Sequence, residues 1–356
     1  MNKLLYIGKR LVLGVPVVLF GLTMTFVIIY LSPFDPTTAI LGRDADPQTA
    51  RQLEVALGLR YPNGQSVPLL IQYKDFLVDT ITFQFGQSWV VTRGQSAAQL
   101  VWERMPATVW LGGWSVLVAL GVGIPLGLYA GLRANTWGDY AASFGGIVWR
   151  AMPNFWLAVM LAGLLSAGGL LSFYRGFLIP TDVIGTPDAL GHLFGSVSVA
   201  GIGIPVPQPY NWAASFKWIL PAALVLGSSS MGNEVRIGRT AVLESINSPY
   251  IDTAKAKGVS ERTIIGKHVA RNAMIPLLPV IMGEFYLLIA GSVLVELIFG
   301  IRGLGNLFLS AILASDVPII SALAYVFILI LVFFNIAQDI AYTIIDPRIG
   351  LEGPDD

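Results

Sequence analysis

The chain has 356 residues, of which 54% are hydrophobic and 12% are charged, and its mean hydropathy is +0.68. A soluble globular domain carries about 25% charged residues, so this composition excludes that class and predicts an integral membrane protein. The net charge is zero and cysteine is absent, which argues against a nucleic-acid partner and excludes disulfide and thiol chemistry.

The first predicted element is a membrane span over residues 11–31, where no charged residue occurs. An apolar helix of about 20 residues is long enough to cross a bilayer core. Lys3, Lys9 and Arg10 precede the span, which favours a cytoplasmic N-terminus. A cleaved signal peptide is the alternative, but no small-residue cleavage site follows the apolar run. We therefore expect residues 1–31 to form the N-terminus and the first transmembrane helix.

Residues 32–106 are predicted to form an extracytoplasmic insert. The insert contains a well-marked helix, because Asp46 can cap its first turn, Pro47 fits its first position and Gly58 suits its end. Its charges are mixed, and a long segment of this kind contributes little to orientation.

Residues 107–344 are predicted to form a core of five further transmembrane helices. The fold class is then an all-α membrane protein with six transmembrane helices and a helical insert after the first. A Gly-, Pro- and Ser-rich outside loop is expected over residues 172–216, and a cytoplasmic tail over 345–356. The five expected spans cover Ala107–Leu132, Ala141–Leu171, Lys217–Met231, Ile275–Val295 and Ile319–Ile344.

The loop after the fourth span, residues 236–275, is strongly basic, whereas the short segment after the fifth span has a single basic residue, Arg302. Basic residues concentrate in cytoplasmic loops, so both termini are expected on the cytoplasmic side. The basic residues of the loop are Arg236, Arg239, Lys255, Lys257, Arg262, Lys267 and Arg271.

Within this loop the sequence predicts a short helix, a glycine bend and a second helix. Ser248 can cap the first helix, Pro249 fits its first turn, and Gly258 suits the left-handed position after its end. Ser260 offers the cap of the second helix, whose first turn contains Glu261 at the positive end of its dipole.

Several segments together resemble one family of transporters. Asp252-Thr253-Ala254 followed by Gly258 is similar to the Glu-Ala-Ala loop of ABC importer permeases, with Asp for Glu and Thr for Ala as departures. "ELIFGIRGLGNLF" from Glu296, "DIAYTIIDPRI" from Asp339, "RMPATVWL" and "MPNFWLAVML" are similar to further segments of the dipeptide, oligopeptide and nickel permeases. The resemblance covers nearly the whole chain and implies the type I, MetI-like permease fold.

The resemblance implies a multi-pass subunit of a prokaryotic inner membrane with no catalytic or metal-binding residues. Its implied partners are a second homologous permease subunit in a heterodimer, two cytoplasmic ATPase subunits, an extracytoplasmic solute-binding protein, membrane lipid and a peptide substrate. ATP and Mg²⁺ would be bound by the ATPases, because this chain has no Walker A loop. The residues that would couple to the ATPases are Tyr250, Ile251, Asp252, Thr253, Ala254, Ala256, Lys257 and Gly258, with Tyr250 and Ile251 as apolar anchors.

Ionisable residues inside spans are costly and usually face protein or water. Arg150 and Glu284 could form a structural pair or line an aqueous pathway independently, and Arg150 could instead reach the cytoplasmic interface. We expect Glu284 on the pathway. The resemblance makes Glu296 and the Gly303–Gly305 segment candidates for an outer gate, and Asp339 a further pathway candidate.

Four alternatives stay open at this stage. The loop could be a solvated hairpin facing lipid headgroups rather than a docking element. The cargo could be a nickel chelate, glutathione or an oligosaccharide instead of a peptide. An ion-coupled secondary transporter would use Arg150, Glu284 and Asp339 as charge relays, but it leaves the capped hairpin unexplained. A membrane-embedded hydrolase is disfavoured because both histidines fall in predicted loops.

Overall fold

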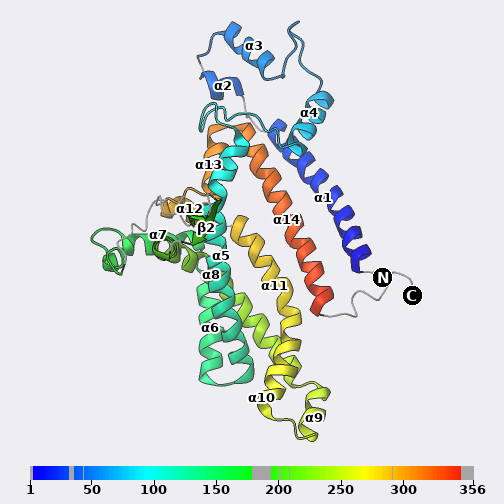
Figure 1. The fold of residues 1–356 in the computed structure, drawn as a ribbon, viewed down its shortest axis with the longest axis vertical. Coiled ribbons are helices and arrows are strands. Elements are labelled where there is room, and N and C mark those ends of the chain that lie inside the picture. Colours follow the sequence, from blue (N-terminus) through cyan, green and yellow to red (C-terminus); the bar gives the residue numbers. More distant parts are fainter. Residues whose placement is uncertain are drawn as a thin grey trace. The chain divides into compact units, whose positions relative to one another are not determined.

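The computed structural model describes residues 3–31, 36–42, 44–178, 194–199, 202–207, 209–290 and 292–345. The chain, whose elements are labelled in Figure 1, forms two compact units, each built from segments that are distant in sequence. Unit 1 consists of Ala107–Arg302 with Ala337–Asp356, and unit 2 consists of Asn2–Pro106 with Gly303–Ile336. The expected tail 345–356 lies almost entirely outside the described residues.

Unit 2 contains the first expected span and the insert. The first span is confirmed as the helix α1, and the helix α3 begins after Asp46 as expected, with the carboxylate accepting the N–H groups of Gln48 and Thr49 at 3.1 Å. Gly58 has a φ of +72°. The helices of unit 2 are α1 (Lys3–Leu31), α2 (Pro36–Leu41), α3 (Pro47–Ala56), α4 (Leu69–Ile81), α13 (Leu304–Ala314) and the adjoining parts of α5 (Ala97–Leu132) and α14 (Val317–Ile345).

A buried carboxylate after α13 holds the end of the insert in place. Asp316 is fully buried and accepts the Ser88 hydroxyl at 2.6 Å. It also accepts the backbone N–H groups of Trp89, Val90 and Val91 at 2.9 to 3.1 Å. The carboxylate thus accepts four hydrogen bonds. These bonds join residues that are more than 220 positions apart in the chain.

Unit 1 contains the larger set of helices and a small hairpin of strands. Its elements are α6 (Trp137–Ala151), α7 (Asn154–Leu165), η1 (Ser172–Arg175), β1 (Phe194–Val199), β2 (Ile202–Pro207), α8 (Pro209–Ile246), α9 (Pro249–Ala256), α10 (Glu261–Thr263), η3 (Ile264–Val269), α11 (Ala270–Ala290) and α12 (Val293–Phe299), with the rest of α5 and α14. The antiparallel pair β1 and β2 lies in the region expected as loop, so the described fold is not purely helical.

The third expected span is broken, which corrects the continuous helix predicted over Ala141–Leu171. Helix α6 ends at Ala151, and α7 starts at Asn154 with its axis turned by 92°. The break falls at Met152 and Pro153, because proline has no N–H to donate and its ring disfavours a helical conformation in the preceding residue. Apolarity continues through the break, so the hydrophobic pattern did not show it.

The helix that contains the fourth expected span is much longer than the expected Lys217–Met231. Helix α8 runs from Pro209 to Ile246, so residues 236–246 are helical rather than part of a loop. The fifth expected span is also shifted, because α11 ends at Ala290 and α12 follows as a separate helix.

By length and composition, three of the described helices could each cross a membrane, or up to five spans result if two bent helix pairs count as one span each. These three helices contain the expected spans one, two and six. The spans expected within α8 and α11 are helices, but their crossing of the membrane remains a prediction.

Helices α5, α6 and α8 approach one another through glycines. A Cβ atom on Gly232 of α8 would clash with the backbone oxygen of Gly146 on α6, so the two backbones are in contact. On α5, a Cβ atom on Gly127 would lie 3.0 Å from the backbone oxygens of Glu234 and Val235. Small residues allow such close helix packing in membranes, where lipid provides no hydrophobic driving force. A separate apolar core, which includes Leu111 of α5, Trp218 of α8 and Phe299 of α12, joins these helices to α7.

Candidate functional site

The helix–glycine–helix segment folds largely as the sequence predicts. Helix α9 covers Pro249–Ala256, and Gly258 has a φ of +72°, the left-handed conformation expected there. The N–H of Gly258 donates to Lys255 O at 2.9 Å, and the N–H of Val259 donates to Ala254 O at 3.1 Å. These bonds satisfy carbonyls at the end of α9 in the manner of a glycine-terminated helix.

The expected serine caps are wrong in their hydrogen bonding, although both serines occupy the positions before the helices. The Ser248 hydroxyl donates to Glu244 O at 2.8 Å, one turn back in α8, instead of accepting an N–H of α9. The Ser260 hydroxyl lies 2.9 Å from Thr263 Oγ1 and makes no cap bond to the backbone. Helix α8 is long enough to offer its last carbonyls as competing acceptors.

One face of α9 is buried against its own chain. Ile251 is 0% exposed and Ala254 is buried, and both pack in an apolar cluster with Val242 of α8, Ile264 of η3 and Ala273 in the first turn of α11. Ile251, which we expected as an apolar anchor for a partner, instead fastens α9 to the ends of α8 and α11. Movement of α9 would therefore be transmitted to both helices.

The opposite face of α9 is open to solvent and is polar with one aromatic side chain. Tyr250 is 41% exposed, and its hydroxyl accepts the side-chain amide of Asn272 at 3.0 Å. The other exposed residues of α9 and of the two positions that follow it are Asp252, Thr253, Lys255, Ala256, Lys257 and Gly258. We call this set, with Tyr250, the outer face of α9.

The segment after Gly258 leads without interruption into α11. Helix α10 is followed by the π-helical turn η3 over Ile264–Val269, which continues directly into α11 at Ala270. Single π-helical turns are rare and occur often at functional sites. Val259 and Ile264 belong to the same apolar cluster, so the glycine bend is packed on both sides.

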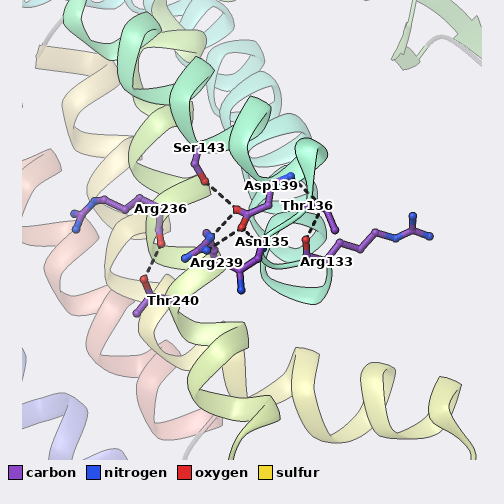
Figure 2. A network of polar contacts seen from close by, with 8 residues as sticks. All are labelled: Arg133, Asn135, Thr136, Asp139, Ser143, Arg236, Arg239 and Thr240. Atoms are coloured by element: carbon purple, nitrogen blue, oxygen red, sulfur yellow. Dashed lines mark hydrogen bonds and ion pairs between the residues drawn. The ribbon is translucent and has the colours of Figure 1, made fainter.

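A buried ion pair joins α6 to α8 (Figure 2). Asp139 is 1% exposed and accepts Arg239 Nε at 2.6 Å and Nη2 at 2.8 Å. It also accepts the Ser143 hydroxyl at 3.1 Å and the Asn135 N–H at 2.8 Å. This pair is not among the residues expected from the sequence, where Arg239 counts only as part of the basic loop. The capping pattern Thr136-x-x-Asp139 is the sequence signal that locates the acid.

Two neighbouring helices, α8 and α11, each carry one buried carboxyl group. Glu234 is 0% exposed, and neither of its side-chain oxygens has a hydrogen-bond partner within the described part of the chain. Glu284 is 3% exposed and is close enough for the two carboxyl groups to repel each other when both are charged. Glu234 packs on Gly123 of α5, and Glu284 Oε2 is likewise without a hydrogen-bond partner among the described residues. Glu284 is thus surrounded by protein, and its place on a transport pathway remains a prediction.

Arg150 does not pair with Glu284 in this structure. Its Nη1 lies 3.5 Å from Asn233 Oδ1 on α8, and its side chain is exposed. Of the three interpretations of these charges, the structural Arg150–Glu284 pair is therefore absent from the described residues.

The other candidate residues occupy separate places. Glu296 of α12 is fully buried, and its Oε1 accepts the hydroxyls of Thr108 at 2.8 Å and Ser292 at 2.9 Å, so it fastens α12 to α5. Gly303 is the residue before α13, Gly305 is buried in its first turn, and Asp339 lies half-buried on α14. These hydrogen bonds of Glu296 go to Thr108 and Ser292 rather than to Glu284. The described residues contain no group of three or more side chains suited to hold a metal ion.

Comparison with known proteins decides the family. The sequence model of the binding-protein-dependent transport system inner membrane component family matches residues 123–351, which include α6, α8, the α9 segment and α11. The chain belongs to this family. The resemblance to ABC importer permeases is thereby confirmed, and the α9 segment lies inside the part of the chain that the family shares.

Relatives of this family match over almost the full length. The dipeptide transport system permease protein DppB of Alkalihalophilus pseudofirmus is 32% identical over 97% of this chain and 99% of its own. The oligopeptide transport system permease protein AppB of Bacillus subtilis is 30% identical over 97% of this chain and 98% of its own. The inner membrane ABC transporter permease protein YejB of Escherichia coli O157:H7 is 31% identical over 88% of this chain and 79% of its own.

Proposed function

We propose that this chain is one of two permease subunits of an ATP-driven importer of short peptides. The relatives named for dipeptide and oligopeptide transport align over nearly the whole chain, which supports the peptide as cargo. The second permease is a homologous chain, and an extracytoplasmic binding protein delivers the peptide. Two cytoplasmic ATPase subunits bind ATP and Mg²⁺.

The observation that carries the coupling role is the two-sided character of α9. Its inner face is fixed to α8 and α11 through Ile251 and Ala254, while its outer face is exposed. A helix held this way accepts a partner on one side and transmits the partner's movement on the other. Closure of the ATPases on ATP would move α8 and α11 together and change access to the pathway.

Uptake by the reconstituted transporter tests the function. Vesicles containing both permeases and the ATPases, supplied with the binding protein outside and ATP inside, should accumulate a labelled dipeptide. A nickel chelate, glutathione and an oligosaccharide serve as competing cargoes. Uptake that needs an ion gradient and continues without ATP would instead identify a secondary transporter.

Orientation gives a separate prediction. We expect residues 32–106 outside and the α9 segment inside the cell, because basic residues cluster around α9. The chain has no native cysteine, so Ser260→Cys provides a single labelling site, and exposed Ser66→Cys provides the matched outside site. An impermeant thiol reagent should label Ser66→Cys in intact cells and Ser260→Cys only after lysis. Labelling of Ser260→Cys in intact cells would reverse the topology and contradict the coupling role.

A further inference from the structure

Two arginines from different helices of unit 1 meet at one side-chain amide. Arg236 of α8 donates from Nη2 to Asn233 Oδ1 at 3.2 Å, and Arg150 of α6 points Nη1 at the same oxygen from 3.5 Å. Both arginine side chains are exposed. The amide oxygen accepts one hydrogen bond from each arginine, so the remaining N–H donors of the two guanidinium groups are presented together on one surface.

Neither guanidinium has an acidic partner among the residues that the structure describes, although acids lie on the same helices. Asp139 is occupied by Arg239, and Figure 2 shows Arg236 extending away from that pair. Glu234 is buried against Gly123 of α5 rather than beside the arginines. Two like charges held together in an apolar segment are unfavourable unless an anion or water meets them.

The backbone of the two helices fixes this arrangement. Gly146 and Gly232 bring α6 and α8 into contact, and a Cβ atom on Gly232 would lie 3.3 Å from Arg150 Cβ. The stem of Arg150 thus starts at the point of close packing between α6 and α8, and Arg236 lies one helical turn beyond Gly232 on α8. A planar guanidinium binds a carboxylate through two parallel hydrogen bonds, and a neighbouring guanidinium adds charge and geometric selectivity.

We propose that Arg150 and Arg236 form a binding site for a carboxylate, occupied during transport by the free C-terminus of the peptide. The proposal rests on the proposed function, which supplies a solute with a carboxylate. Lipid phosphate is less suited if α6 enters the membrane at Trp137, because Arg150 then lies roughly 20 Å further along the helix, inside a hydrocarbon core of about 30 Å. Charged side chains at such depth typically mark a solute pathway.

The test compares a dipeptide with its C-terminal amide in the reconstituted transporter, using vesicles of phosphatidylcholine alone. Arg150→Gln and Arg236→Gln should each lower uptake of the free acid about tenfold or more and change uptake of the amide less than about twofold. The same binding protein is present throughout at saturating concentration, so a change in the acid-to-amide ratio arises in the permease. Arg133→Gln removes another exposed arginine of unit 1 and should leave the ratio unchanged.

Arg236→Lys keeps the charge and should retain part of the preference, which separates loss of binding from loss of folding. Equal loss of acid and amide uptake, or unchanged acid uptake, would overturn the site. An effect of Arg236→Gln that appears only when anionic lipid is added would assign the arginines to a headgroup and also overturn it. Failure of the wild-type transporter to take up either peptide would contradict the proposed function itself.

Discussion

Replacing Gly258 by valine should reduce peptide uptake at least about tenfold and abolish the link between uptake and ATP hydrolysis. Gly258 has a φ of +72°, and a β-branched residue there is strained by about 1 to 2 kcal/mol or more. The bend would relax to another conformation and displace α9 from the cluster around Ile251. Uptake and ATPase rates of the reconstituted transporter, measured together, check this result.

The geometry offers two sharp controls for this substitution. A Cβ atom at Gly258 would meet nothing within 4 Å, so the expected defect is due to the backbone and not to a clash. Gly258→Asn should preserve most uptake, because asparagine tolerates the left-handed region. Gly266→Val adds the same side chain at a helical position that is equally open, and it should have a much smaller effect. Normal uptake by Gly258→Val would remove the argument for a glycine-dependent bend.

Removing the buried carboxylate of Asp139 should strongly destabilise the protein. Asp139→Ala leaves Arg239 without its bidentate partner and removes acceptors used by Ser143 and the Asn135 N–H. Hydrogen bonds to charged groups contribute about 1.5 to 3 kcal/mol each, and an orphaned charge adds a desolvation cost. We expect the melting temperature of the purified protein to fall by roughly 5 to 10 °C.

A double-mutant cycle distinguishes loss of the pair from loss of the carboxyl group alone. Asp139→Ala with Arg239→Met should be more stable than the sum of the two single changes predicts, because the double variant leaves no unpaired charge. Ser143→Ala, which removes a single neutral donor, should lower the melting temperature much less. Strictly additive effects of Asp139→Ala and Arg239→Met would show that the ion pair does not lock α6 to α8.

Elements with local signals were predictable from the sequence. The α1 and α14 spans follow from long uncharged runs, and α3 follows from its Asp46 cap and terminal Gly58. The left-handed Gly258 followed from the need to end one helix and start another within two residues. Each of these features depends on residues close together in the chain, so periodicity and capping rules were sufficient.

Features set by distant residues could not be predicted in the same way. Hydropathy shows neither the extension of α8 past Met231 nor the pairing of its Arg239 with Asp139 on α6. The break at Pro153 differs, because the proline is a local signal that the apolar residues on both sides obscured. The burial of Ile251 depends on α8 and α11 meeting beneath α9. Asp316 is a similar case, since its four donors come from residues 88–91. Hydrophobicity shows which segments are helices, but it does not show which polar groups face each other.

Crosslinking from the outer face of α9 to an ATPase subunit tests the central claim most directly. The cysteine-free chain allows a single cysteine at exposed Thr253 or at the adjacent buried Ala254. In membranes that contain the whole transporter, a short thiol-to-amine reagent should join Thr253→Cys to an ATPase subunit and should leave Ala254→Cys largely unjoined. If Thr253→Cys reacts with the reagent but forms no product with an ATPase subunit present in the same membranes, α9 is not the coupling helix and the account is contradicted.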